Sequence, residues 1–349
     1  MESRDEMKPV YINGIGVVIP GVNELEEMWC LLEAEEGMEG SRIHEIPPFI
    51  ASRKIRRMDR FSILALYGTY SVFKDLSKFK SEYDPYEVGT VYNSDFGTLN
   101  TVLEFAQCFT DSVEASPVTF ANTVMNACIG HICIELGLKG ASTMMVGSNY
   151  IGYAMQLIRH GKVKSVLAGG LDEYNKELFD TFNERGICVN EGVSTMLLSS
   201  EITGDSFCEI IACSEINLGE HYCFSEQFEP NLSDLKKAIS NMLIKANLSA
   251  DNIDVVITAS DNKSFTEVEV ASIHDVFGEK IDVLHPKYIL GELLGASLGI
   301  NLTVGALILK QQKVPHLDLN KEIKYVLVSD FNISGNYTTF ILKQSAHFK

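Results

Sequence analysis

The residues with the clearest chemical potential are a lysine and a glutamate in the last quarter of the chain, Lys287 and Glu292. Glu292 stands in the run Gly291–Ala296 (GELLGA), and Lys287 precedes it by five residues. An ammonium group and a carboxylate at this spacing can pair and neutralise each other in a partly buried site. The alternative is an acid–base pair that transfers protons. An ionised Glu292 accepts hydrogen bonds but donates none, so it would repel a developing oxyanion.

Two residues qualify as candidate nucleophiles, Ser148 and Cys128. A serine nucleophile needs an adjacent base, normally histidine, and the segment Gly140–Gly152 holds none. The alternative is that Ser148 caps the helix that follows, a role that suits a small polar side chain. Cys128 lies in an apolar run, where a reduced thiol behaves as a small hydrophobic side chain. The eight cysteines form no CxxC pair and the eight histidines no HxH or HExxH pattern, so we predict no metal site.

The composition limits the functions that these residues can serve. With 46% hydrophobic and 22% charged residues among 349, the chain can bury a large core. Its formal net charge of −18 disfavours nucleic acid and anionic membranes as partners, because both require a basic surface. No apolar run reaches the ~18 residues of a membrane span. The charged segment Met1–Glu6 has no apolar signal core, so we expect a cytoplasmic protein.

The elements that must position the candidate residues alternate between strands and helices. Short runs rich in Val and Ile predict strands, and longer runs with apolar residues at helical spacing predict helices. The expected strands are Val10–Val18, Val88–Tyr92, Ser142–Val146, Ser165–Ala168, Thr195–Ser199, Glu209–Ser214, Ile253–Thr258, Tyr325–Ser329 and Thr338–Leu342. The expected helices are Leu25–Glu36, Asp59–Leu76, Asn122–Leu136, Ile151–Arg159, Asn231–Ala246, Thr266–Phe277 and Leu294–Leu309. The strands Thr195–Ser199 and Glu209–Ser214 are expected to be neighbours, and the helix Leu294–Leu309 to be almost fully buried. The alternation predicts an α/β protein whose sheets are covered by helices on both faces.

Several segments of the chain form an ordered set. They are Tyr11–Gly16 (YINGIG), Met58–Phe61 (MDRF), Asn122–His131 (NTVMNACIGH) with Gly137–Gly140, Leu167–Gly170 (LAGG), and Gly278–Glu279 with Lys287–Ala296 (KYILGELLGA). In order and spacing this set resembles the β-ketoacyl synthases of the thiolase superfamily, although each segment alone would be a weak match. The resemblance implies a thiolase-like five-layer α-β-α-β-α fold and a dimer. It also implies two pseudo-repeated halves within one compact unit, residues 1–200 and 201–349.

The resemblance further indicates which residues stand at the catalytic positions of the family. The family uses a cysteine at a helix N-terminus and two histidines that assist decarboxylation and hold the oxyanion. At the nucleophile position this sequence has Ser148 or Asn149, and at the histidine positions it has Ser260 and Glu292. The family's lysine is retained as Lys287. We therefore predict a catalytically degenerate member with no catalytic residues of its own.

Two more regions have roles in the family. The family's gating loop corresponds to Asp330–Tyr337, which contains Phe331, and Ile333 stands where the family has its gating phenylalanine. Only one of the three glycines of that loop remains, so a thioester is not expected to approach it. The family's dimer-interface segment corresponds to Asn122, Thr123, Val124, Met125 and Asn126. The side chains of this segment either line the acyl tunnel of a partner subunit or form plain dimer core.

These features favour a non-catalytic subunit that resembles the chain length factor of a type II polyketide or aryl polyene synthase. Such a subunit would form a heterodimer with an active β-ketoacyl synthase and shape its acyl tunnel. It would meet acyl carrier protein only indirectly, because a chain of net charge −18 repels that acidic partner. No cofactor is expected. Two alternatives stay open, an acyltransferase or thioesterase of altered chemistry that uses Ser148 or Cys128, and a homodimeric ligand-binding scaffold.

Overall fold

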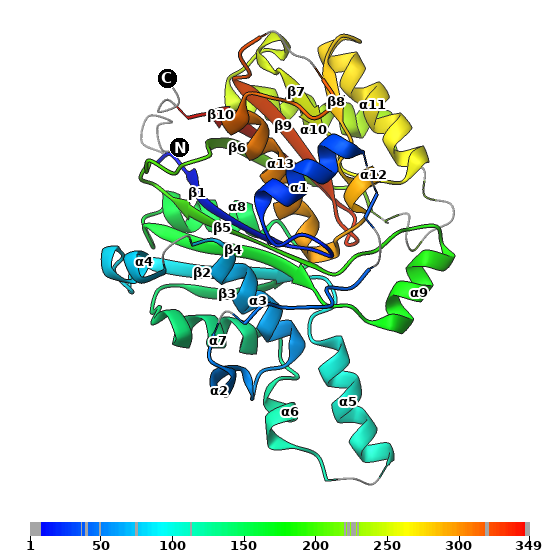
Figure 1. Ribbon diagram of the computed structural model, residues 1–349. Coiled ribbons are helices and arrows are strands. Elements are labelled where there is room, and N and C mark those ends of the chain that lie inside the picture. The colour runs from blue at the N-terminus through cyan, green and yellow to red at the C-terminus, as the bar shows by residue number, and fades with distance from the viewer. Residues whose placement is uncertain are drawn as a thin grey trace.

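The computed structural model describes residues 8–35, 37–38, 41–48, 50–73, 76–111, 114–219, 221, 224, 228, 230–317 and 321–345. Within these residues ten strands form one sheet. The strands are β1 (Tyr11–Val18), β2 (Val88–Ser94), β3 (Ser142–Val146), β4 (Ser165–Asp172), β5 (Gly192–Ser199), β6 (Cys208–Asn217), β7 (Val255–Ile257), β8 (Asp282–Leu284), β9 (Tyr325–Phe331) and β10 (Asn336–Gln344). Their order is β3-β2-β4-β5-β1-β6-β10-β9-β7-β8 (Figure 1).

The strand order repeats itself in the two halves of the chain. Counted outward from the centre, the first half runs β1-β5-β4-β2-β3 and the second runs β6-β10-β9-β7-β8. The pairing directions also match, with two antiparallel pairs followed by two parallel pairs in each half. The halves join where β1 and β6 pair at Tyr11–Glu209 and Ile12–Cys208. The predicted pseudo-repeat is confirmed, and we propose that its boundary lies between β5 and β6, near residue 200.

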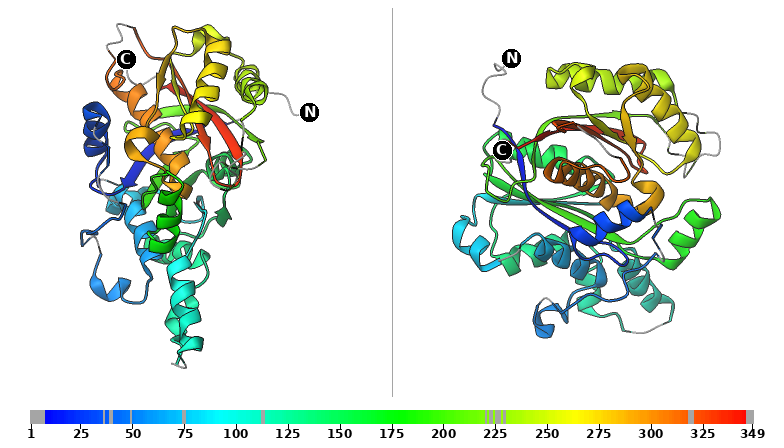
Figure 2. Two further views of the ribbon diagram at one scale, coloured as in Figure 1. Left: turned by 90° about the vertical axis from the view of Figure 1, so that its right-hand side faces the viewer. Right: turned by 45° about the horizontal axis from the view of Figure 1, so that its top comes forward.

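Helices cover both faces of each half-sheet. They are α1 (Leu25–Ala34), α2 (Ser52–Ile55), α3 (Arg60–Ser71), α4 (Leu76–Glu82), α5 (Leu99–Thr110), α6 (Pro117–Ala121), α7 (Asn126–Leu136), α8 (Tyr150–Arg159), α9 (Lys176–Glu184), α10 (Leu232–Ala246), α11 (Lys263–Phe277), α12 (Lys287–Leu290) and α13 (Ser297–Gln311), with short 3₁₀ turns at Ala250–Asn252 and Leu294–Ala296. The helices α3 and α7 lie outside the first half-sheet, α10 and α11 lie outside the second, and α8 and α13 lie between the two (Figure 2). This is the five-layer α-β-α-β-α arrangement that we predicted.

The side-chain pattern of the central strands explains the layers. In β4, Leu167 and Leu171 face the cluster under α3 and α7, whereas Val166 and Ala168 face the central cluster with α8 and α13. A strand that is apolar on both faces must be covered on both faces. The segment Leu294–Gln311 is long and apolar enough to cross a membrane, but 89% of it is buried inside the protein, as in a core helix.

Some expected elements differ from those observed. The strands β5 and β6 are not neighbours, because β1 lies between them and separates the two half-sheets. The expected helix Asp59–Leu76 is two helices: α3 ends at Ser71, and α4 begins at Leu76. The expected helix Asn122–Leu136 begins only at Asn126, because Asn122 already ends the short helix α6. In Figure 1, α5 and α6 project below the body of the molecule.

Candidate functional site

The carboxyl ends of parallel strands from both halves bring the candidate residues together. In the first half, Ser94 ends β2, Val146 ends β3 and Asp172 ends β4, and these strands are parallel neighbours. The turn after β3 leads through Ser148 into α8. In the second half, β9 ends at Phe331 and the segment before α13 carries Glu292. We call the region where these ends meet the residual site.

The turn before α8 contains the two residues at the predicted nucleophile position. Asn149 is the N-cap of α8, since its Oδ1 accepts a hydrogen bond of 2.8 Å from the Gly152 N–H. The prediction that Ser148 caps this helix is therefore wrong by one residue. The Ser148 N–H and Oγ instead lie 3.2 and 3.4 Å from the Asn93 Oδ1. An amide oxygen cannot take up a serine proton as a base, so this geometry does not activate Ser148.

Lys287 and Glu292 form the predicted ion pair, with 2.8 Å between Nζ and Oε2. Asp330 of β9 joins them, because the Lys287 Nζ is also 3.0 Å from the Asp330 Oδ1. All three side chains are buried, with 3 to 5% of each exposed. Burial alone would lower the pKa of Lys287, but the charges of Asp330 and Glu292 outweigh it and raise that pKa. Lys287 is thus held firmly as an ammonium ion.

Glu292 uses its remaining oxygen for two further hydrogen bonds. Its Oε1 accepts from the Leu294 N–H at 2.8 Å and from the Ser297 Oγ at 2.5 Å. Burial would raise the pKa of Glu292, but the charge of Lys287 and the hydrogen bonds from Lys287 and Ser297 lower it. Glu292 is therefore an ionised acceptor whose two oxygens are both engaged. It can neither donate to an oxyanion nor release a proton at neutral pH.

Ser260 lies in the turn before α11 and is completely buried. Its Oγ accepts a hydrogen bond of 2.9 Å from the Asn262 N–H, and its carbonyl oxygen accepts one of 3.1 Å from the Thr266 Oγ1. These bonds fix the turn that starts α11, so Ser260 has a local structural role here.

The loop after β9 lies against the turn that carries Ser148. Phe331 is buried, and its ring is stacked on that of Phe265 with centroids 4.6 Å apart. Ile333 packs against the cluster that contains Leu294. A Cβ added to Gly147 would collide with the Ser334 Oγ, so Ser334 occupies the space over the turn. The space beside Lys287, between α12 and α13, is too small to hold a water molecule, since its cavity volume is about 0 Å³.

Two residues of the residual site were missed in the sequence. Asp95 follows β2, and both of its carboxylate oxygens are buried with no hydrogen-bond partner among the described residues. Burial, and then the charges of Asp172 and Glu292, raise the pKa of Asp95 well above its usual value. His221 lies with its ring centroid 4.5 Å from that of Phe331, and burial lowers its pKa to about 3, so the imidazole is neutral. No pattern in the sequence marks either residue, because their burial depends on the fold.

The predicted interface segment lies beside the residual site, at the start of α7. The Asn122 Nδ2 donates to the Arg57 carbonyl oxygen at 2.8 Å. Thr123 accepts through its carbonyl oxygen from the Thr98 Oγ1 at 3.0 Å, and Asn126 is exposed. Val124 is 54% exposed. The Met125 side chain lies over Gly97, in the loop that also carries Asp95, so this segment contacts the rim of the residual site.

Cys128, the second candidate nucleophile, is buried in the cluster under α3 and α7. Burial raises the pKa of the Cys128 thiol, which therefore stays protonated and unreactive. Among the described residues, no group of three or more His, Cys, Asp or Glu side chains is arranged to hold a metal ion. Cys223 lies outside the described residues.

Comparison with known proteins shows which family this chain resembles. The model of the "Beta-ketoacyl synthase, N-terminal domain" family matches residues 48–200. A 3-oxoacyl-[acyl-carrier-protein] synthase 2 from Coxiella burnetii is 20% identical over 89% of this chain and 88% of its own length. Residues 48–200 of the chain thus resemble the N-terminal domain of β-ketoacyl synthases. The synthase of the same name from Synechocystis is 25% identical, over 48% of this chain and 46% of its own length.

Several solved structures share the fold of this chain. A β-ketoacyl synthase from Burkholderia phymatum has a TM-score of 0.82 at 19% identity, covering 97% of this chain and 100% of its own. The ishigamide ketosynthase/chain length factor has a TM-score of 0.82 at 16% identity, with coverage of 97% and 100%. A ketosynthase in complex with its chain length factor from Xenorhabdus doucetiae has a TM-score of 0.78 at 16% identity, with coverage of 99% and 100%. These likenesses establish the thiolase-type fold.

Proposed function

We propose that this chain is a non-catalytic ketosynthase-like subunit, a chain length factor. In this role it forms a heterodimer with an active β-ketoacyl synthase and shapes the acyl tunnel of that enzyme. The observation that carries the proposal is the state of Glu292. A condensing enzyme needs a hydrogen-bond donor to the thioester oxyanion. Glu292 stands at one of the family's histidine positions as an ionised acceptor, engaged by Lys287, Leu294 and Ser297.

The rest of the residual site supports the same reading. Ser148 contacts an amide oxygen rather than a base. Ser334 fills the space over Gly147, where a thioester would have to approach. Several independent losses at one site could hardly leave a Claisen condensation.

An unpaired apolar surface supports the proposed heterodimer. The strand β3 is at the edge of the sheet, so one side of its backbone is open to another chain. Four large apolar side chains on and around α7 and β3 are more than half exposed: Phe120 (61%), Val124 (54%), Ile134 (82%) and Val146 (56%). The family resemblance independently assigns the start of α7 to the dimer interface. Two of the similar solved structures are named for a ketosynthase with a chain length factor, which adds support.

Two assays test the proposal. The isolated chain, supplied with malonyl thioester on acyl carrier protein, should neither decarboxylate nor condense it. When the chain is co-expressed with an active ketosynthase from the same genome that is its partner, the two should co-purify and make product only together. Decarboxylation by the isolated chain at the rate of an ordinary ketosynthase would contradict the proposal, and so would a ketosynthase that is fully active and makes the same product without this chain.

A further inference from the structure

The helices α5 and α6 form an arm that projects from the body of the molecule (Figure 1). They pack on each other through Phe105, whose ring centroid is 5.3 Å from those of Phe109 and Phe120. Of the 12 residues of α5 only Thr101 is buried, and it lies in the first turn. The attachment of α5 to the body therefore depends on its first turn, which we call the base of the arm.

Asn100 joins the base of the arm to the segment that follows β4. Its backbone N–H donates to the Glu173 Oε1 at 3.2 Å, and its Nδ2 donates to the Tyr174 carbonyl oxygen at 2.9 Å. Its Oδ1 accepts from the Asn175 Nδ2 at 2.8 Å. Of these three hydrogen bonds, only the one to Glu173 involves an ionisable side chain. The hold of the body on Asn100 can therefore depend on the protonation of Glu173.

Glu173 lies in surroundings that disfavour its charge. The residue is only 3% exposed, and its Oε2 is buried with no hydrogen-bond partner among the described residues. A carboxylate that leaves water without gaining partners is less stable than its protonated form. Burial raises the pKa of Glu173 to about 7, although the hydrogen bonds from Asn100 act to lower it. With the base of the arm closed, Glu173 therefore exchanges its proton near neutral pH.

The neighbouring charges do not offset this burial. Asp59, whose Oδ2 accepts from the Thr101 Oγ1 at 3.2 Å, and Glu191 are both acidic, and their charges raise the pKa of Glu173. The guanidinium of Arg60 is bound to Glu191, with Nε 2.8 Å from Oε1 and Nη2 2.6 Å from Oε2. Its charge is thus largely spent on Glu191 rather than on Glu173.

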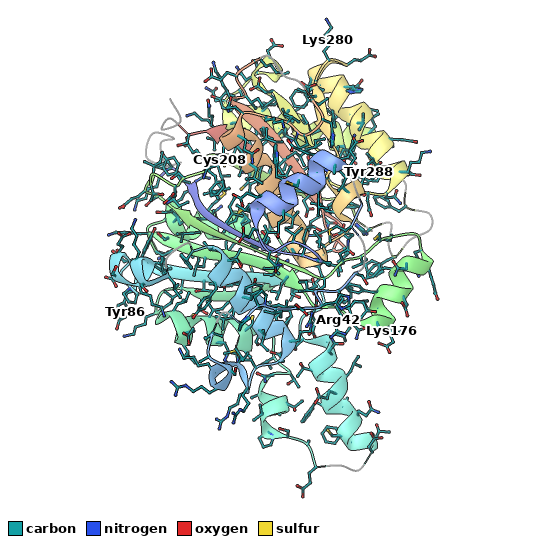
Figure 3. The ribbon with its side chains drawn as sticks, viewed as in Figure 1. Arg42, Tyr86, Lys176, Cys208, Lys280 and Tyr288 are labelled. Carbon is teal, nitrogen blue, oxygen red and sulfur yellow. The ribbon has the colours of Figure 1, made fainter. Side chains whose placement is uncertain are left out.

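Two further basic side chains lie around the base of the arm. Arg42, labelled in Figure 3, is exposed, and its guanidinium carbon is 5.7 Å from the ring centroid of Tyr174. Burial lowers the pKa of His131 of α7, against the charge of Asp59, so the imidazole is neutral at pH 7. Solvent screens the charge of the exposed Arg42. Glu173 is therefore the group of this cluster whose charge changes near neutral pH.

We propose that Glu173 is a proton-controlled latch at the base of the arm, which holds α5 firmly while Glu173 is protonated and lets it open more readily once Glu173 is ionised. Opening admits water to the carboxyl group, which then ionises with its ordinary pKa of about 4.3. Between that value and the pKa of about 7 in the closed form, the closed form keeps a proton that the open form has lost. The equilibrium constant for opening therefore rises with pH in this range, by at most about tenfold per pH unit, and levels off above it. This inference does not rest on the proposed chain length factor role.

Hydrogen exchange at the Asn100 amide tests the latch, because this N–H donates to Glu173. Its protection factor should fall about sevenfold between pH 5.5 and pH 6.5, and less than about twofold between pH 7.5 and pH 8.5. The Ala168 amide in β4 should stay at least about a hundredfold more protected than Asn100, which shows that the opening is local. In protein labelled with ¹³C-glutamate, the carboxyl carbon of Glu173 should titrate in the NMR spectrum with a midpoint near pH 7.

Two matched substitutions separate the latch from a general effect of charge. Glu173→Gln keeps the shape of the protonated acid, and the protection factor of Asn100 should then stay constant within about twofold over both pH ranges. Glu104→Gln removes the same charge at an exposed position of α5 and should follow the wild-type profile. The inference is overturned if the wild-type protection factor at Asn100 does not change between pH 5.5 and pH 6.5, if Glu173→Gln keeps the wild-type fall, or if the Glu173 carboxyl group titrates below pH 5. The wild-type exchange profile and carboxyl titration decide the question even if Glu173→Gln does not fold.

Discussion

Replacement of Asp95 by asparagine should change how the stability of the protein depends on pH. Asp95 is buried without a hydrogen-bond partner among the described residues, and its folded-state pKa is raised well above its usual value by burial and by Asp172 and Glu292. In the unfolded chain an aspartate loses its proton at about pH 3.9. Above that pH the unfolded state releases the proton while the folded state keeps it. The free energy of unfolding therefore falls by about 1.4 kcal/mol per pH unit until the folded-state pKa is reached.

Asp95→Asn keeps the shape of the neutral acid and removes the ionisation. Relative to the wild-type protein, the variant should be more stabilised at pH 6 than at pH 5, by at most about 1.4 kcal/mol, as measured by urea denaturation at each pH. Asp251→Asn, at an exposed position, is the matched control and should follow the wild-type profile. Asp172→Asn should instead destabilise the protein at both pH values by about 2 kcal/mol, because Asp172 accepts four hydrogen bonds. Parallel pH profiles for Asp95→Asn and the wild-type protein would refute the reasoning.

Substitutions at three further positions, with Gly204 as a control, probe the site, the interface and the packing. Glu292→Gln should lower the free energy of unfolding by about 2 kcal/mol and leave product formation by the assembled complex nearly intact; a hundredfold loss of product with the complex still assembled would indicate a chemical role. In the co-expressed heterodimer, Met125→Ala should lengthen the product and Met125→Phe should shorten it; an unchanged product length in soluble, assembled variants would mean that this residue only holds the dimer together. Gly170→Ala should destabilise the protein by about 3 kcal/mol, because the added Cβ meets the Gly295 carbonyl oxygen. Gly204→Ala, where an added Cβ meets nothing, should unfold within about 0.5 kcal/mol of the wild-type protein, and equal unfolding midpoints for these two variants would contradict the packing argument.

The sequence predicted the local elements better than their arrangement. Apolar runs located β1 and β3 to within one residue. For β1 the reason is that a strand buried on both faces has a continuous apolar pattern. The same patterns placed β5 beside β6, because no local signal shows that β1, nearly two hundred residues earlier, enters between them. The helix α5 was not predicted, and three of its large side chains, Val102, Leu103 and Phe109, are exposed in the single chain.

The contacts of the candidate site could be predicted from the sequence only where the two residues lie close together in the chain. The pairing of Lys287 with Glu292 followed from a spacing of five residues. The third member, Asp330, is supplied by β9, and no spacing rule connects it to Lys287. The burial of Asp95 is also a property of the tertiary structure, since it depends on Asp172 and on the loop after β9. No sequence motif links Asp330 or Asp95 to this ion pair, so only the structure places them in the site.

Glycines in the segments that carry the family resemblance have a packing role in the fold. A Cβ added to Gly170, in the LAGG segment, would meet the Gly295 carbonyl oxygen in the GELLGA segment. A Cβ added to Gly295 would lie 2.8 Å from the Ser94 Cα and 2.9 Å from the Asp172 Oδ2. These glycines let the two halves approach at the carboxyl ends of their strands, so the motifs record a packing requirement of the fold. Within the same frame, the side chains of Ser148, Ser260 and Glu292 form hydrogen bonds that hold local structure. We propose that a chain under these constraints keeps the close glycine contacts of the fold while the residues at the family's catalytic positions serve only to stabilise the site.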